Sequence, residues 1–195
     1  MKRAETKKLF APIASVGLAC ALAATVAVPG ATVQAKQGTA EETQEQAQEQ
    51  ATQVMRRLYN PYSGEHFYTS DVEEVLNLTA LGWTDEGVGW TAPATGTDVF
   101  RLYNPYSSDH HFTTSEDERD ALVELGWKDE GVGFHSADAE SGVAVNRLYN
   151  PYVTVGTHHY TLSAVEYDAL EGYGWQKEGV GFYASKASYS TALKV

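Results

Sequence analysis

Three stretches of this chain repeat one order of hydrophobic and polar positions. In the first, alternating side chains run from Met55 to Tyr59 and stop at Asn60-Pro61, a pair that initiates turns. A second short strand, His66 to Thr69, and a short amphipathic segment follow, and a last strand passes through Val88-Gly89-Trp90. The pattern therefore predicts strand, strand, helix and strand in each stretch.

Each predicted helix has its own start and stop signals. An N-cap residue is followed three positions later by glutamate, which is the pattern of a capping box. The N-caps are Asp71, Ser115 and Ser163, and the glutamates are Glu74, Glu118 and Glu166. A glycine suited to the left-handed conformation ends each helix, at Gly82, Gly126 and Gly174. Apolar or aromatic residues three apart give each helix one apolar face: Leu78 and Leu81, Leu122 and Leu125, and Leu170 and Tyr173.

The three stretches align as tandem copies with a period of 44 to 46 residues. Such a period is typical of repeat architectures, in which a unit cannot bury its own apolar face and packs on its neighbours. We therefore expect an α+β fold in which three tandem β-β-α-β repeats pack with pseudo-threefold symmetry into one domain, residues 54–186. The repeats are residues 54–93, 98–137 and 144–184. A β-trefoil-like fold is the alternative, although three capped helices argue against it.

The segments outside the repeats predict export. Residues 1–35 have the basic start, the apolar run from Leu9 to Val28 and the small-residue site Val33-Gln34-Ala35 of a secretory signal peptide. A retained membrane anchor is the alternative, because about 20 apolar residues can span a bilayer. Residues 36–53 are Gln/Glu-rich and predict a disordered linker, and residues 187–195 form a C-terminal tail. The predicted location is secreted or extracellular, including the cell surface.

Composition narrows the classes of partner. The 195-residue chain has a single cysteine, Cys20 in the leader, so disulfides do not hold the domain together. The formal net charge is −12 and becomes more negative once the basic leader is removed. This charge argues against nucleic acid, because binding to phosphates depends on Lys and Arg. It also argues against a membrane partner for the mature form.

Three histidines align between the copies: His66, His110 and His158. They invite a metal hypothesis, because three imidazoles on one axis could form a site. Strand alternation instead places them on the face that carries Tyr68, Phe112 and Tyr160, the expected inner face. We therefore predict packed, structural histidines and neither a metal nor a cofactor. His111 and His159 point to the opposite face and are predicted to lie at the surface.

No catalytic constellation is found in the sequence. It has no Gly-x-Ser-x-Gly elbow, no phosphate-binding glycine loop and no His-Glu-x-x-His, and adjacent carboxylates point apart on a strand. The recurring arginines and glutamates are predicted to form one strand-to-strand ion pair in each copy, and the recurring tryptophans to be structural. These residues are Arg57, Arg101 and Arg147, Glu86, Glu130 and Glu178, and Trp83, Trp127 and Trp175. The chain is therefore not predicted to be an enzyme.

The turn after the first strand carries the candidate ligand-binding residues. In each copy an asparagine precedes proline and tyrosine: Asn60 and Tyr62, Asn104 and Tyr106, and Asn150 and Tyr152. Flat rings beside amides suit sugars, which present apolar C–H faces together with hydroxyls. The structural alternative is that asparagine caps the turn and tyrosine packs on the neighbouring repeat.

These motifs resemble a family of tandem repeats in secreted bacterial and fungal proteins, catalogued as a domain of unknown function. In the first copy the resemblance rests on Arg57 to Pro61, His66 to Thr69, Gly82-Trp83 and Glu86 to Val88. The third copy departs most, with a longer loop and Leu162 where the second has Thr114. Similar repeats are often appended to extracellular hydrolases, which implies a surface- or glycan-binding accessory role.

The expected function is that of a secreted, non-enzymatic binding module. Its expected partner is a cell-wall or host glycan, or a cell-surface protein. The alternatives are a protein–protein adhesion or assembly module and a small cell-wall hydrolase.

Overall fold

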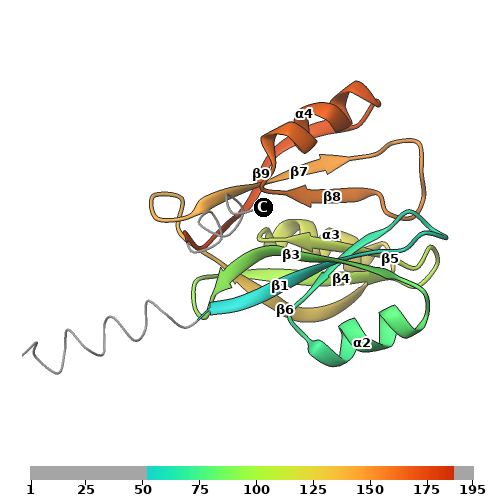
Figure 1. Cartoon of the computed structure of the whole chain (residues 1–195), viewed down its shortest axis with the longest axis horizontal. Helices are drawn as coiled ribbons and strands as arrows, with labels where there is room; N and C mark the ends of the chain where they lie inside the picture. Colours follow the sequence, from blue (N-terminus) through green and yellow to red (C-terminus); the bar gives the residue numbers. More distant parts are fainter. Residues whose placement is uncertain (1–51, 187–195) are drawn as a thin grey trace, which may run out of the picture. The chain divides into compact units, whose positions relative to one another are not determined.

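The computed structural model describes residues 52–186 of the chain (Figure 1). The predicted signal peptide, residues 1–35, and the predicted C-terminal tail, residues 187–195, lie outside these residues. So does the predicted linker, residues 36–53, apart from Thr52 and Gln53, which begin strand β1.

The described residues form three sheets, each accompanied by one short helix. The first has β1 (Thr52–Tyr59), β2 (His66–Thr69) and β3 (Thr84–Pro93), with α2 (Val72–Ala80). The second has β4 (Thr97–Asn104), β5 (Asp109–Thr113) and β6 (Lys128–Ser136), with α3 (Glu116–Glu124). The third has β7 (Val143–Tyr149), β8 (His158–Thr161) and β9 (Gln176–Ala184), with α4 (Ala164–Gly172). We call each sheet with its helix a unit.

The first strand of each unit lies in the centre of its sheet. The strand orders are β2-β1-β3, β5-β4-β6 and β8-β7-β9, and all neighbours are antiparallel. In the first sheet Arg57 stands opposite Tyr68 of β2 and Gly87 of β3. A β-bulge follows at that point, where Gly87 has a φ of 98°, a conformation that glycine adopts without strain.

The predicted fold class is wrong. The described residues are mostly β, with 47% strand and 20% helix in three separate three-stranded antiparallel sheets, and this is not the expected α+β repeat fold of β-β-α-β units. The β-trefoil alternative is wrong as well, because the strands form three separate sheets. The helices contribute no buried residue. Leu81, expected on a buried helix face, is exposed, so the strands carry the core and the helices lie on the surface.

The core joins the three sheets through aromatic rings from their last strands. Trp90 of β3, Phe134 of β6 and Phe182 of β9 are each 2% exposed. The Trp90 ring centroid lies 5.6 Å from that of Phe134 and 5.2 Å from that of Phe182. The Phe134 and Phe182 centroids are 5.0 Å apart, so each ring contacts both others. Aromatic pairs at this spacing add to the free energy of burial, which stabilises the three sheets against one another.

The predicted helix signals are present at both ends. Asp71, Ser115 and Ser163 are N-caps whose side chains accept hydrogen bonds from the first turn. Gly82, Gly126 and Gly174 follow the helices with φ of 96°, 93° and 93°. The reciprocal half of the capping box differs from the prediction. The Asp71 N–H donates to Thr69 Oγ1 at 3.0 Å, and the Thr69 hydroxyl in turn bonds Glu74.

Candidate functional site

The predicted ligand-binding tyrosines lie at the turn between the first two strands of each unit. Tyr62, Tyr106 and Tyr152 are 85%, 84% and 78% exposed. Each ring leans over the glycine that ends the helix of its own unit. A β-carbon at Gly82 would lie 3.4 Å from Tyr62 Cε2, and one at Gly174 would lie 2.9 Å from Tyr152 Cε2. The rings therefore pack on their own unit and not on a neighbouring one, and one face of each stays open to solvent.

The predicted asparagines hold the turns. Asn60 Oδ1 accepts the N–H of Tyr62 at 3.0 Å and that of Ser63 at 3.3 Å. Asn104 and Asn150 bond the N–H of Tyr106 and Tyr152 in the same way, at 2.9 and 3.0 Å. This is the turn-capping arrangement that asparagine favours. The side-chain carbonyl of each asparagine is therefore engaged, and the aromatic ring is the larger group offered to a ligand.

A second exposed apolar residue directly precedes the helix-ending glycine that each tyrosine contacts. Leu81, Leu125 and Tyr173 are 72%, 73% and 82% exposed. Sequence reasoning missed them as surface residues because it placed Leu81, Leu125 and Tyr173 on the apolar face of the helices. Their position next to the left-handed glycine was the available signal, because the chain leaves the helix axis there. We call each pair of exposed apolar residues a tip patch.

The prediction for His111 and His159 is wrong, because both are buried with an exposed fraction of 2%. The second strand of each sheet is covered on both faces, since a neighbouring unit packs on the side expected to face solvent. The His159 ring lies 4.6 Å from that of His66, and the His111 ring lies 4.3 Å from that of His158. Phe67 takes the corresponding place in the first unit.

His66, His110 and His158 are half-buried at these junctions. Burial, followed by the charges of His159 and Arg57, lowers the pKa of His66 to about 3. Burial and the neighbouring His111 lower the pKa of His158 to about 3 in the same way. These two histidines are therefore neutral at physiological pH. Within residues 52–186 no group of three or more His, Cys, Asp or Glu side chains is arranged to hold a metal ion.

Each predicted strand-to-strand ion pair is present, and each arginine also binds a second carboxylate. Within the units the Nε–carboxylate distances are 2.7 Å for Arg57–Glu86, 2.9 Å for Arg101–Glu130 and 2.8 Å for Arg147–Glu178. The second carboxylates come from the neighbouring units, at 3.0 Å for Arg57–Glu166, 3.0 Å for Arg101–Glu74 and 2.9 Å for Arg147–Glu118. These contacts link the third unit to the first, the first to the second and the second to the third. The sequence missed this ring of contacts because it assigned the same glutamates to capping boxes.

The recurring tryptophans follow the helices and are half-buried. Each meets a ring of the second strand edge-on. The centroid distances are 6.3 Å for Trp83–Phe67, 6.3 Å for Trp127–His111 and 6.1 Å for Trp175–His159. Their contacts are with the protein interior, in keeping with a structural role.

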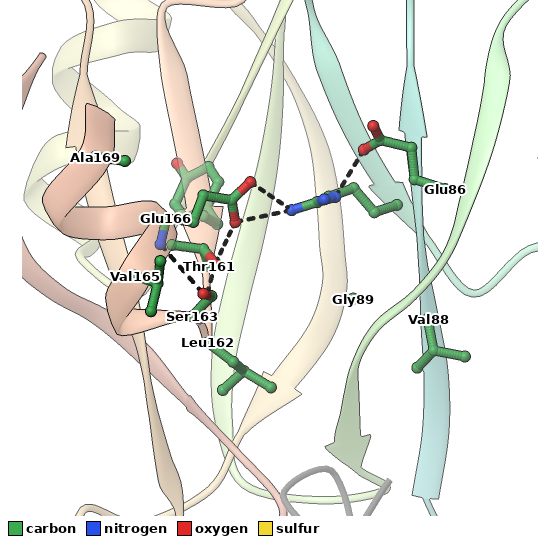
Figure 2. Close-up of a pocket in the computed structure, with 11 residues that line it drawn as sticks. Glu86, Val88, Gly89, Thr161, Leu162, Ser163, Val165, Glu166 and Ala169 are labelled. Atoms are coloured by element: carbon green, nitrogen blue, oxygen red, sulfur yellow. Dashed lines mark hydrogen bonds and ion pairs between the residues drawn. The ribbon is translucent and has the colours of Figure 1, made fainter. Parts of the chain in front are cut away.

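A pocket of about 600 Å³ lies between the first and third units. Figure 2 shows Glu86 and Val88 on the side of the first unit and Glu166, Leu162 and Val165 on the side of the third. Arg57 lies between the two glutamates and binds both. We call this pocket the first–third groove.

Arg57 and Glu166 hold each other in their charged states in the groove. Burial would raise the pKa of Glu166, but the nearby His159 and Thr161 side chains and the charge of Arg57 hold that pKa well below its usual range. Burial would lower the pKa of Arg57, but the charges of Glu166 and Glu86 raise it above its usual value. Glu166 therefore stays ionised and Arg57 protonated, whereas a general acid needs a pKa near the working pH.

Comparison with known proteins identifies a family and no individual relative. The family described as Domain of unknown function (DUF5648) matches residues 54–185. No curated protein matches the chain, and no solved structure matches it. Between residues 52 and 186 no helix has both the length and the apolar character needed to cross a membrane.

Proposed function

The chain belongs to the DUF5648 family, and from its geometry we propose that it is a secreted, non-enzymatic binding module for cell-wall or host glycan. The observation that carries the proposal is the exposure of Tyr62, Tyr106 and Tyr152 at equivalent turns of three units. Three rings in equivalent positions, each more than three-quarters exposed, are not needed for packing of the core.

The tyrosines are suited to sugar because they are both exposed and held in place. The turn asparagine fixes the backbone of each tyrosine, and the left-handed glycine lets the ring lie close to the helix end. A ring that is already ordered loses little conformational freedom when a ligand stacks on it. Its apolar face receives the C–H face of a sugar ring, and its hydroxyl can bond sugar hydroxyls.

Three tip patches on one chain favour a ligand that presents the same chemical group many times. A single exposed ring supports only weak binding, whereas linked sites gain affinity through effective concentration without any new contact. Polysaccharides and densely glycosylated surfaces meet this condition. An accessory role beside extracellular hydrolases, which the resemblance of the repeats implies, would suit such a surface-binding module.

The decisive test is binding of the full chain to a glycan array and to purified cell wall. We expect binding that falls at least tenfold in the triple variant Tyr62→Ala, Tyr106→Ala, Tyr152→Ala. Leu76→Ala is the matched control, because Leu76 is also exposed and apolar but lies on the helix, outside the tip patches. A blank array together with no retention on cell wall would overturn the proposal, as would consumption of a polymer by the purified protein.

A protein partner is the second candidate, favoured by Leu81 and Leu125 beside two of the tyrosines. Leucine offers apolar area without hydrogen-bonding groups, as protein–protein contacts often use. Pull-down from surface extracts separates the candidates. Capture that glycan competitors abolish supports glycan, and capture that they leave unchanged supports a protein.

A further inference from the structure

The first–third groove has two equivalents, and the three differ in a way that the fold does not require. The groove between the first and second units has a pocket of about 190 Å³, lined by Arg101, Glu130 and Val132 on one side and Ser70 and Glu74 on the other. Between the second and third units the pocket is about 330 Å³, and residues 137–140 line part of it. At about 600 Å³, the first–third groove is the largest of the three and lies near the middle of the volume range of small-molecule sites.

The strand wall is the same in all three grooves. Val88, Val132 and Val180 occupy equivalent positions before a glycine, and all three are about half exposed. The strand wall therefore does not set the first–third groove apart.

The helix wall differs between the grooves. The first–third groove has Leu162 and Val165, where the first unit has Ser70 and Glu73 and the second has Thr114 and Asp117. Val165 is 81% exposed, so its side chain contributes little to the core. Leu162 is partly buried and also packs against the core. Because polar residues serve the fold at both positions in the other two units, the exposed Val165 is a property of the groove and not of the folding pattern.

On the polar side of the groove, Arg57 and Glu86 each keep an atom that can form a further hydrogen bond. Arg57 uses Nε for Glu86 and Nη1 for Glu166, and its Nη2 bonds no residue in the described range 52–186. Glu86 uses Oε2 for Arg57, and its Oε1 likewise bonds no residue of this range. Two carboxylates face a single guanidinium, so the groove has excess negative charge and disfavours anionic ligands.

We propose that the first–third groove is a binding site for the acetamido group of an N-acetylated sugar. The acetamido group has a carbonyl for the Arg57 guanidinium, an N–H for Glu86 and a methyl group for the wall of Leu162 and Val165. It is neutral, as the charge of the groove demands. This site deepens the proposed glycan-binding function and rests on it, adding selectivity for one class of sugar to the general affinity of the tip patches.

An extended peptide fits this place less well than a sugar. A peptide strand would pair with the outer edge of β3, which requires a run of free backbone groups. The Thr91 carbonyl of β3 already accepts the N–H of Ser185 at 2.8 Å and its hydroxyl at 2.9 Å. Arg57 Nη2 and Glu86 Oε1 supply one donor and one acceptor, which matches a single amide.

The test compares two trisaccharides that differ only in the group at carbon 2, triacetylchitotriose and cellotriose, by calorimetric titration of the full chain. We expect the N-acetylated sugar to bind at least tenfold more tightly. Val165→Glu installs the side chain that the first unit has at Glu73, and it should bring the ratio of the two affinities close to one. Val72→Glu is the matched control, because it adds the same charge at an exposed valine outside the groove, and it should leave the ratio unchanged.

The tip-patch variant separates failure of this inference from failure of the proposed function. Replacing the three tip tyrosines by alanine should weaken both sugars alike and preserve their ratio. A ratio near one in the unmodified chain, or a preference that survives Val165→Glu, would overturn the acetamido site while leaving glycan binding intact. Tighter binding of N-acetyl-alanine methylamide than of triacetylchitotriose would assign the groove to peptide. If neither trisaccharide binds and the glycan array is blank, both proposals fail.

Discussion

The Tyr160 hydroxyl bonds both backbone groups of Phe112, donating to its carbonyl oxygen at 2.7 Å and accepting from its N–H at 3.0 Å. Tyr68 does the same to Tyr160, at 2.9 and 3.1 Å. These bonds join the second strands of neighbouring units inside the core. Phe112 occupies the equivalent position in the second unit, and it has no hydroxyl that could bond the backbone of Tyr68.

We therefore expect Phe112→Tyr to stabilise the protein. The new hydroxyl would meet the backbone of Tyr68 as the other two meet theirs, and a net hydrogen bond contributes about 1 kcal/mol. The expected outcome is a higher midpoint in chemical denaturation. Phe134→Tyr is the control, because Phe134 is equally buried but belongs to the ring triangle, where a hydroxyl without a partner costs about 1–3 kcal/mol.

The same junction predicts coupling with Phe67. The Tyr160 hydroxyl lies 3.4 Å from His111 Nδ1 and the Tyr68 hydroxyl lies 3.4 Å from His159 Nδ1, whereas Phe67 occupies the third histidine position. Phe67→His together with Phe112→Tyr should stabilise by more than the sum of the single changes. Additive or opposing effects in the double-mutant cycle would show that the junction of Phe67 and Phe112 is more stable with two apolar side chains.

The ion pair between Arg57 and Glu166 should matter as much as the one between Arg147 and Glu118. The first joins residues 109 positions apart and closes the ring of contacts from the third unit to the first. Both glutamates are about two-thirds buried, and a lost bond to a charged partner costs about 1.5–3 kcal/mol. Glu166→Gln and Glu118→Gln should therefore lower the free energy of unfolding by similar amounts. A loss for Glu118→Gln alone would show that ring closure contributes nothing to stability.

Local features of this fold could be predicted from sequence, and features that depend on distant partners could not. The N-cap of Asp71 needs only the residues that follow it, and Arg57 pairs with Glu86 on an adjacent strand. Glu166, by contrast, forms its ion pair with a residue of another unit. The capping-box pattern, which spans only four residues, could not predict that contact. His159 was placed at the surface for the same reason, because alternation predicts two faces but not a neighbour that covers the second.

The prediction of the fold class was wrong for a related physical reason. Hydrophobic spacing predicted helices with an apolar face, but Leu81 is exposed and no residue of α2 is fully buried. A capped helix of nine residues can be stabilised by its ends and by the partly buried Val75 and Leu78. Only part of the candidate site could be predicted from the sequence. The turn tyrosines lie within one repeated motif, whereas the groove near Leu162 forms only where two units meet.

Stability should fall as pH drops from about 6.5 to 3, because His66 and His158 have pKa values of about 3 in the folded protein. The unfolded chain binds protons at the ordinary pKa of about 6.5 and so binds more of them in this window, which destabilises the folded state as pH falls. The charged and titratable groups around these histidines are Arg57, Glu86, His159 and Glu166 for His66, and Arg147, Glu178, His111 and Glu118 for His158.

The size of this effect is measurable by urea denaturation at pH 7 and pH 5. Each histidine should contribute about 1–2 kcal/mol of lost stability between these values. His66→Asn should remove its share of the pH dependence, whatever it does to stability at pH 7. The lowered pKa values of Glu118 and Glu166 act in the same direction, but mainly below their ordinary values near 4.5, which lie below the interval from pH 7 to pH 5. Equal stability at pH 7 and pH 5 would contradict the neutral state of the two histidines.

Gly174→Ala should destabilise the protein in two separable ways. Gly174 has a φ of 93°, where an alanine side chain costs about 1–2 kcal/mol because its β-carbon approaches the backbone too closely. The new β-carbon would also lie 2.9 Å from Tyr152 Cε2, so the ring must move off the helix end.

Tyr152→Ala alone should change stability by less than about 0.5 kcal/mol, because the ring is exposed. In the double variant the contact is gone and only the backbone cost remains, so Tyr152→Ala should recover part of the loss. Recovery of the whole loss would mean that the glycine is required for the tyrosine alone, and no recovery would mean that the ring does not rest on the helix end in solution.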